Sequence, residues 1–391
     1  MIKRDIENIL LKYINNFPVV GVIGPRQVGK TTLVKAISEQ LRNKPVLYLD
    51  LEKPFDIELL KNPETLFSQN IEKTIIIDEI QHKPELFPII RSLVDIKREN
   101  GRFIILGSAS PEIIRKSAET LAGRIVYVEL SGFSYLEIEN HITYKQHIIR
   151  GGFPNASLEE DDELRSVWMD NFISTYVERY FPMLGLNANP AVLRRFWTML
   201  AHYNSNIWNA SQFANSLGVS VPTVQRYFDF LEGSFITTIL RPYHINIKKR
   251  LVKSPKVYFR DSGIATHLIG IDSYDALQNN TVIGATWESY AVEQIRHAVA
   301  NANNIQLYYY RTQRGAECDL VITKGEKPVA TVEIKHSNLP STTKGYSSAI
   351  QDINIKDNYV ITPSAKKHAI KENIIVNSLV DFLKTDLIKY L

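Results

Sequence analysis

The sequence predicts an α/β protein of several domains, and three observations support that prediction. Between residues 17 and 150, apolar runs rich in β-branched residues alternate with helical stretches, which is typical of a parallel sheet covered by helices. Residues 151–205 contain no such runs and read as helices. From about residue 280, an amphipathic helix is followed by further strands. A chain of 391 residues also exceeds one ordinary core and favours two to four domains.

The five strands expected in the N-terminal part are continuous apolar runs, as strands buried on both faces require. They read PVVGVIG, PVLYLDL, KTIIIDEI, RFIILGSA and RIVYVEL.

The composition of the chain is that of a folded protein and argues against disulfide-rich and membrane-spanning classes. The apolar fraction of 44% and the charged fraction of 23% are typical of a folded domain protein. The single cysteine, Cys318, excludes a disulfide framework and a cysteine-based zinc site. No apolar run approaches the length of a membrane span. Polar residues interrupt the apolar run of the N-terminal segment, so we do not expect it to be a secretory signal. We therefore expect a cytoplasmic protein without a membrane span. The net charge of +4 permits contact with nucleic acid without requiring it.

A phosphate-binding loop is predicted where the first strand ends. The segment GPRQVGKT fits G-x-x-x-x-G-K-[ST], with an apolar strand before it and an amphipathic helix after it. Glycines let backbone N–H groups turn toward phosphate oxygens, and the helix N-terminus favours negative charge. Lys30 would bridge the β- and γ-phosphates, and Thr31 would bind Mg²⁺. The expected nucleotide contacts are Gly24, Pro25, Arg26, Gln27, Val28, Gly29, Lys30, Thr31 and Thr32.

Two further strand ends carry polar residues that suit nucleotide hydrolysis. In KTIIIDEI, an apolar run leads to Asp78 and Glu79 at the strand end, the Walker B arrangement. Asp78 would hold the Mg²⁺ shell, and Glu79 would orient and activate the attacking water. RFIILGSAS places Ser108 at another strand end, as a candidate for sensing the γ-phosphate. A simple turn is the alternative for Ser108.

These motifs together resemble the AAA+ ATPase superfamily, in particular a bacterial and archaeal group that begins with GPRQVGKTTL. The strings IIIDEIQ, GSAS, ETLAGRIVYVEL and RGGFP carry the resemblance over roughly residues 1–200. It implies binding of ATP or ADP with Mg²⁺, a homo-oligomer with nucleotide at subunit interfaces, and Arg124 as the arginine finger or sensor. An ordinary surface arginine is the alternative. Lys256 and Asp261 also match the family pattern, but the sequence gives no role for either residue.

A helix-turn-helix is predicted in the segment NASQFANSLGVSVPTVQRYFDFLEG. Ser211 is the expected cap of the first helix, and Gly218 the turn. A strand of a wing follows, and then the basic run NIKKRLVKSPK. Gln225 and Arg226 would be exposed on the second helix, which enters the major groove in DNA-binding proteins. Winged helices also serve as protein-interaction modules, so DNA binding and scaffolding remain alternatives.

The C-terminal part has a second candidate site. Asp319 precedes the strand VATVEIK, on which Glu333 and Lys335 face the same way because side chains alternate along a strand. Helix, strand, Asp, strand, Glu-x-Lys resembles the PD-(D/E)XK nuclease-like fold. That resemblance implies that Asp319 and Glu333 hold Mg²⁺, that Glu288 reaches it from the helix, and that Lys335 acts in catalysis. A salt bridge on an exposed edge strand, or a nuclease-like domain that only grips nucleic acid, is the alternative.

The sequence thus predicts four regions, and their functions follow from the motifs. Residues 1–150 form the AAA+ P-loop domain, 151–205 a helical lid, 206–275 a winged helix-turn-helix and 276–391 a nuclease-like domain. The leading hypothesis is an ATP-hydrolysing protein that acts on DNA. The alternatives are an ATP-dependent oligomeric scaffold for a protein partner and an ATP-gated metal-dependent nuclease.

Overall fold

The computed structural model divides the chain into two compact units. It describes residues 2–40, 44–110, 121–244, 251–302, 304–337, 340–371 and 373–391. One unit comprises residues 1–133, 153–155 and 233–236, and the other comprises 134–152, 156–232 and 237–391. No helix within these described ranges combines the length and the apolar character that crossing a bilayer requires.

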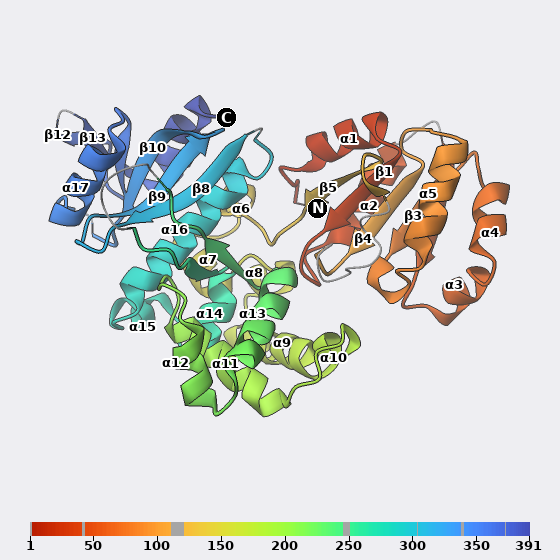
Figure 1. The fold of residues 1–391 in the computed structure, drawn as a ribbon, viewed down its shortest axis with the longest axis horizontal. Coiled ribbons are helices and arrows are strands. Elements are labelled where there is room, and N and C mark those ends of the chain that lie inside the picture. The colour runs from red at the N-terminus through yellow and green to blue at the C-terminus, as the bar shows by residue number, and fades with distance from the viewer. Residues whose placement is uncertain are drawn as a thin grey trace. The chain divides into compact units, whose positions relative to one another are not determined.

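The N-terminal unit is built on a parallel sheet (Figure 1). Its five strands have the order β2-β3-β4-β1-β5. Its strands are β1 (Val19–Ile23), β2 (Val46–Asp50), β3 (Thr74–Asp78), β4 (Phe103–Gly107) and β5 (Ile125–Glu129). Every neighbouring pair in this sheet is parallel. Each strand lies within one of the predicted apolar runs, so the predicted α/β fold class is confirmed.

Helices pack on this sheet because its central strands are apolar on both faces. Every residue of β3 and β4 is buried. The helices are α1 (Glu7–Asn16), α2 (Lys30–Gln40), α3 (Pro54–Leu59), α4 (Pro63–Gln69) and α5 (Leu86–Ile96), with a 3₁₀ turn at Ile80–His82. Helix α5 buries Leu86, Phe87, Ile90, Leu93 and Val94, the spacing of one helical face.

The segment after the first sheet is helical, as predicted. Its helices are α6 (Tyr135–Ile138), α7 (Tyr144–Arg150), α8 (Pro154–Ser157), α9 (Asp162–Thr175), α10 (Phe181–Met183) and α11 (Pro190–His202), with a π-helical turn at Tyr176–Tyr180. Aromatic rings join these elements: the ring centroid of Trp197 lies 6.1 Å from that of Tyr176 and 6.0 Å from that of Phe181. Such edge-to-face and tilted pairs stabilise a helical core beyond their buried area.

The predicted helix-turn-helix is present as α12 (Ala210–Leu217) and α13 (Val221–Gly233). Gly218 forms the turn with φ +69°, a conformation that suits glycine. The predicted cap was wrong: the Asn209 side chain accepts from the Gln212 N–H at 3.3 Å, so α12 begins before Ser211. An antiparallel pair follows, β6 (Thr237–Leu240) with β7 (Lys256–Phe259). Residues 245–250 of the predicted basic run lie outside the described residues.

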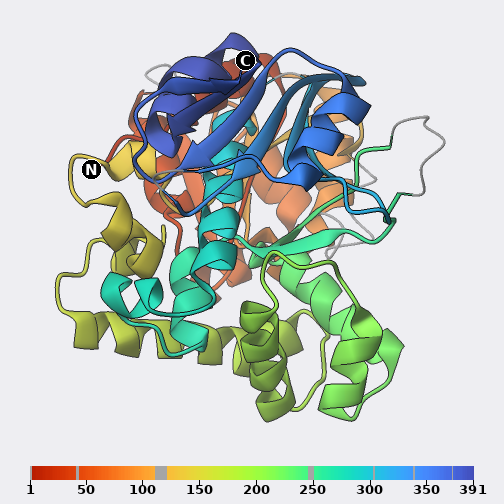
Figure 2. The ribbon, with the colours of Figure 1, turned by 90° about the vertical axis from the view of Figure 1, so that its left-hand side faces the viewer.

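The C-terminal sheet is mixed and has six strands in the order β12-β13-β11-β10-β9-β8. The strands are β8 (Ile305–Arg311), β9 (Glu317–Lys324), β10 (Lys327–Ile334), β11 (Asn358–Thr362), β12 (His368–Lys371) and β13 (Ile374–Ser378). The helices are α14 (Ser262–Leu268), α15 (Tyr274–Gln278), α16 (Ile283–Val299), α17 (Lys344–Ile353) and α18 (Leu379–Asp381), with final turns at Phe382–Asp386 and Leu387–Lys389. Helix α16 packs on this sheet (Figure 2), and α17 packs on it through a separate cluster.

Asp261, for which the sequence suggested no role, clamps the RGGFP segment. Its carboxylate accepts from the Gly152 N–H at 2.7 Å and from the Ile264 N–H at 2.9 Å, where it also caps α14. Burial raises the pKa of Asp261 to about 6, although these backbone donors favour the charged form. A Cβ added at Gly151 would lie 2.2 Å from Asp261 Oδ1, so the clamp has no room for a side chain there.

We predict that Gly263→Ala destabilises the clamp by about 1–3 kcal/mol, because overpacking against backbone cannot be relieved by a side-chain rotation. The added Cβ would lie 2.6 Å from the carbonyl carbon and oxygen of Arg150 and from the Gly151 nitrogen. Gly284→Ala is the matched control, since its Cβ would meet nothing within 4 Å and lies in helix α16. Urea unfolding followed by tryptophan fluorescence measures both variants. Equal midpoints for the two variants would contradict the clamp.

Candidate nucleotide site and a second acidic site

The glycine-rich loop follows β1, which lies between β4 and β5 in the sheet. Gly24 has φ +152°, and a Cβ there would lie 1.9 Å from the Leu130 carbonyl oxygen. Gly29 has φ +92°, and Gln27 adopts the left-handed region with φ +65°. The Arg4 guanidinium connects the loop to the segment after β5, because it donates to the carbonyl oxygens of Val28 at 3.2 Å and Ser131 at 2.7 Å. The loop therefore has a fixed, compact conformation before helix α2.

Lys30 begins helix α2, and its ammonium is buried among neutral oxygens. It donates to the carbonyl oxygens of Gly24 at 3.0 Å and Pro25 at 2.7 Å, and to Ser108 Oγ at 3.1 Å. Burial lowers the pKa of Lys30 to about 8, against the attraction of Glu79 and Asp78. Among the described residues, no carboxylate forms an ion pair with this ammonium, and a buried ammonium with neutral partners is a favourable partner for an added anion.

Thr31 and Asp78, predicted as Mg²⁺ ligands, contact each other. The Thr31 hydroxyl donates to Asp78 Oδ2 at 2.6 Å, across 47 residues of sequence. The Tyr48 hydroxyl, on neighbouring strand β2, donates to the same oxygen. Burial and the hydrogen bond to Asp78 raise the pKa of Tyr48, which keeps the phenol protonated as a donor. The hydroxyl and carboxylate oxygens of Thr31 and Asp78 are the hard ligands that Mg²⁺ takes, so this pair fits the ion.

The Glu79 carboxylate is contacted by Ser108, from the end of β4, and by Gln81, two residues further along the chain. It has φ +57°, an uncommon left-handed conformation for glutamate. Its two carboxylate oxygens lie 3.0 and 2.9 Å from Ser108 Oγ, and Gln81 Nε2 donates to Oε2. Ser108, predicted as a candidate sensor, thus lies between the Lys30 ammonium and the Glu79 carboxylate.

The two arginines predicted near the nucleotide both form ion pairs within the chain. Arg26 pairs with Glu52. Arg124 forms a two-pronged pair with Asp95, with Nε to Oδ1 at 2.6 Å and NH2 to Oδ2 at 3.0 Å. The role of Arg124 as a finger stays a prediction, and on this geometry it would require Arg124 to exchange Asp95 for phosphate.

Asp319 and Glu333 are brought together by neighbouring strands β9 and β10. Strand β10 lies between β9 and β11, so the alternative of an exposed edge strand was wrong. Asp319 Oδ2 accepts from the Ile334 N–H at 2.9 Å. Glu333 Oε1 pairs with Lys335 Nζ at 2.7 Å and accepts from the Thr343 hydroxyl at 3.3 Å. Burial, and then the charge of Asp319, raise the pKa of Glu333 to about 7.

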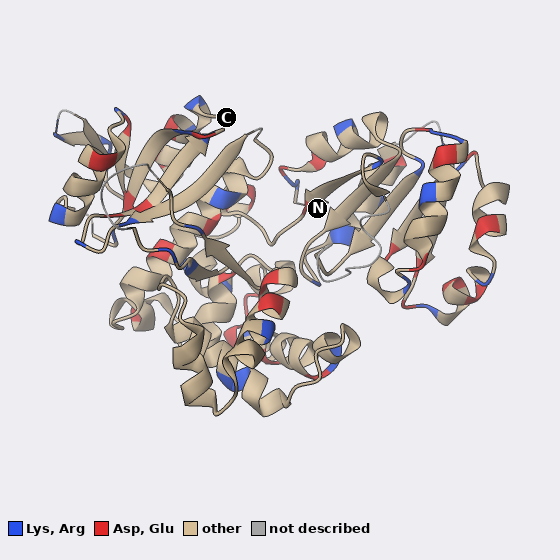
Figure 3. Ribbon diagram, viewed as in Figure 1, with Lys and Arg blue, Asp and Glu red and all other residues tan. Residues whose placement is uncertain are grey.

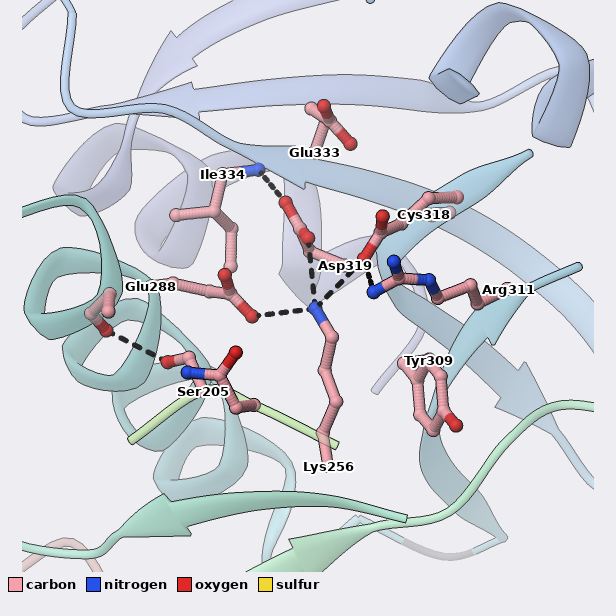
Figure 4. A network of polar contacts seen from close by, with 12 residues as sticks. Ser205, Lys256, Glu288, Tyr309, Arg311, Cys318, Asp319, Glu333 and Ile334 are labelled. Atoms are coloured by element: carbon pink, nitrogen blue, oxygen red, sulfur yellow. Dashed lines mark hydrogen bonds and ion pairs between the residues drawn. The ribbon is translucent and has the colours of Figure 1, made fainter. Parts of the chain in front are cut away.

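Lys256 occupies the space that the sequence assigned to a metal ion. Its ammonium lies 2.9 Å from Glu288 Oε1, 3.3 Å from Asp319 Oδ1 and 3.5 Å from Glu317 Oε1 (Figure 4). The predicted approach of Glu288 to a metal is thus replaced by contacts with Lys256 and with the Tyr258 hydroxyl at 2.8 Å. Within the described ranges, no three His, Cys, Asp or Glu side chains are grouped to hold a metal ion.

Electrostatics agree with a charged ammonium at this position. Burial disfavours the charged form of Lys256, but Tyr258, Glu288 and Asp319 outweigh it, and the pKa of Lys256 is raised. Burial and the charge of Asp319 raise the pKa of Glu288 to about 7. Divalent cations need oxygen ligands close around them, and here an ammonium already holds those oxygens. The residues present therefore do not fit a metal ion in this arrangement.

The sequence analysis did not identify Tyr48, Gln81 or Glu317 as site residues. It named Lys256 but gave it no role. Tyr48 is separated from Asp78 by 30 residues, and only the strand order places them together. Gln81 follows the acidic pair closely, and its position in IIIDEIQ was the available signal.

Comparison with known proteins identifies the family of the chain. A family model described as an AAA domain matches residues 16–139. Two models described as domains of unknown function, DUF8612 and DUF4143, match residues 142–275 and 283–382. Uncharacterized proteins of Mycobacterium bovis and Mycobacterium tuberculosis are each 36% identical over 373 residues, which cover 95% of this chain and 82% of theirs. The chain belongs to the family of these mycobacterial proteins. Its N-terminal domain is of the AAA type, with a P-loop ATPase fold.

Solved structures show more distant similarity. A Walker-type ATPase of Pyrococcus abyssi aligns with TM-score 0.44 and 15% identity over 68% of this chain and 96% of its own. AMPPCP-bound DnaA of Aquifex aeolicus aligns with TM-score 0.32 and 12% identity over 58% and 86% of the two chains. RuvB of Thermotoga maritima aligns with TM-score 0.31 and 17% identity over 61% and 88%.

Proposed function

We propose that the chain binds ATP with Mg²⁺ and hydrolyses it at the loop between β1 and α2. The observation that carries this proposal is the set of contacts linking Lys30, Ser108 and Glu79 beside the Thr31–Asp78 pair. Three strand ends of one parallel sheet supply these residues, and ligands bind at such carboxyl ends.

Each residue has a distinct part in the proposed reaction. Lys30 would exchange its carbonyl partners for phosphate oxygens, which bear the charge that its present partners lack. Thr31 and Asp78 would hold Mg²⁺, which neutralises charge on the phosphates when bound. Glu79 would orient the attacking water, and Ser108 would position Glu79 relative to the γ-phosphate.

Assembly into a homo-oligomer is part of the proposal. An arginine from a neighbouring subunit stabilises transition-state charge in related chemistry. Arg124 is our candidate, and its exposed pair with Asp95 has little to hold it, since exposed ion pairs contribute little stability.

We predict that Lys30→Ala lowers phosphate release from ATP by on the order of 100-fold or more, because one preorganised charge is lost from the phosphate site. The measurement is colorimetric phosphate release under saturating ATP and Mg²⁺. Lys61→Ala is the matched control, an exposed lysine that pairs only with Glu58 among the described contacts. Turnover that is equal in wild type and Lys30→Ala would exclude this loop as the hydrolytic site.

We predict that Ser108→Ala lowers kcat by about 10- to 100-fold while ATP affinity changes by only a few-fold. The substitution removes the hydroxyl between Lys30 and Glu79 but leaves the Thr31–Asp78 pair in place. Calorimetric binding of a slowly hydrolysed ATP analogue and steady-state turnover separate the two effects. Ser92→Ala, on the exposed face of α5, is the control. If Ser108→Ala leaves kcat unchanged, Ser108 has no part in hydrolysis and serves only in the turn.

Contact with DNA through α13 is the second proposed function. Gln225 and Arg226 are exposed on α13, which supports it. The charges of these helices give DNA contact little support. Helix α12 has no charged residue, and α13 has two acidic residues, Asp229 and Glu232, besides Arg226 (Figure 3). Both exposed side chains also have partners: Gln225 Nε2 donates to Asp229 Oδ1 at 2.8 Å, and Arg226 donates to the Gly185 carbonyl at 2.7 Å. Binding DNA would require these contacts to be exchanged.

An ATP-dependent scaffold for a protein partner is the alternative for the same surface. It would use the nucleotide to change assembly and would not need basic residues on α13. We propose no cleavage step at the C-terminal acids, because the Lys256 ammonium lies among them.

We predict that a Gln225→Ala/Arg226→Ala variant binds duplex DNA about tenfold more weakly than wild type, because polar contacts to base edges and phosphates are lost. Fluorescence anisotropy at several salt concentrations is the measurement. A Gln212→Ala/Arg195→Ala variant is the control, with the same residue types exposed on α12 and α11. Absence of DNA binding by wild type, together with a larger assembly in the ATP analogue than in ADP, would favour the scaffold.

A further inference from the structure

The C-terminal acidic site has a complete set of cationic partners from its own chain. Lys256 contacts Glu288, Glu317 and Asp319. Lys335 contacts Glu333, and Arg311 NH1 lies 3.4 Å from Glu317 Oε1. Each of these four carboxylates therefore has a positive charge within ion-pair distance.

The position of Lys256 is unusually enclosed for a lysine. Its side chain is 4% exposed, although lysine is seldom fully buried unless it is paired. The ring centroid of Tyr309 lies 5.9 Å from the ammonium, which adds a weaker favourable contact. Lys256 belongs to β7, which pairs with β6 and not with the six-stranded sheet that holds Asp319 and Glu333. The ammonium thus enters the acidic site from a separate element.

Lys256 contacts an oxygen of each of the two acids between which a divalent ion would lie. Asp319 Oδ1 faces Lys256, and Asp319 Oδ2 accepts from the Ile334 N–H. Glu288 Oε1 receives both the Lys256 ammonium and the Tyr258 hydroxyl. A divalent cation bound to Glu288 and Asp319 would lie a few ångströms from the ammonium, where like charges in a buried site repel strongly.

We infer that Lys256 is the resident cation of this site and that its ammonium takes the place of a divalent metal between Glu288 and Asp319. The ammonium of Lys256 offsets part of the negative charge of these buried acids, and removing one partner of a buried ion pair leaves an uncompensated charge. Replacing Lys256 by a neutral side chain of similar length leaves the Glu288 and Asp319 carboxylates without the ammonium that contacts both of them. Such a pair is a ready ligand set for a hard divalent ion.

The test is calorimetric titration of Mn²⁺ into the full, nucleotide-free chain. Four proteins are compared: wild type, Lys256→Met, Lys256→Met/Asp319→Asn and Asp319→Asn. We expect Lys256→Met to gain a Mn²⁺ site at least about tenfold tighter than anything in wild type, since the repulsion between ammonium and ion is gone. The double variant should lose that site. Lys327→Met, an exposed lysine at the start of β10, should behave as wild type.

Two results would overturn the inference. One is Mn²⁺ binding by wild type that Asp319→Asn abolishes, which would mean that a metal enters despite Lys256. The other is a folded Lys256→Met variant, checked by circular dichroism, that gains no Mn²⁺ site. If Lys256→Met does not fold, the comparison of wild type with Asp319→Asn still decides, because the inference requires equal Mn²⁺ binding by these two proteins.

Discussion

Burying an ammonium is costly, and the two sites of this protein meet that cost in opposite ways. Lys30 is held by two carbonyls and a hydroxyl, and its pKa falls to about 8. Lys256 is held by carboxylates, and its pKa rises. A buried charge with only neutral partners favours an added anion, whereas a buried charge with acidic partners has nothing left to attract. We therefore propose that Lys30 is open to a phosphate group, whereas the carboxylates around Lys256 leave no place for a further ion.

The fold determines which partners each lysine meets. Lys30 follows a central parallel strand, where the ends of β3 and β4 supply Asp78, Glu79 and Ser108. Lys256 reaches its acids from β7, and five residues later Asp261 clamps the RGG turn and caps α14. One short segment thus supplies an ammonium to the acidic site and a carboxylate to the turn after α7. Lys256 and Asp261 match the family pattern in the sequence, and these contacts give each of them a structural role.

Local signals in the sequence predicted the strands of the first sheet and a loop whose side chains lie together in the structure. Continuous apolar runs indicated the strands, and the spacing of Gly24, Gly29 and Lys30 indicated the loop. The prediction of a metal at Asp319 did not take Lys256 into account. Lys256 lies 63 residues before Asp319 and belongs to another sheet, so no local pattern shows that the two side chains meet. Tyr48 was missed likewise, because strand order and not spacing brings it to Asp78.

The most direct test of this account is an anomalous-scattering experiment on crystals grown with Mn²⁺ and a slowly hydrolysed ATP analogue. The account predicts a Mn²⁺ peak beside Thr31 and Asp78, with phosphate oxygens on Lys30, and no peak among Glu288, Asp319 and Glu333. A Mn²⁺ peak on Asp319 with Lys256 still in contact would contradict it, since the ammonium could not then be the cation on which that site depends.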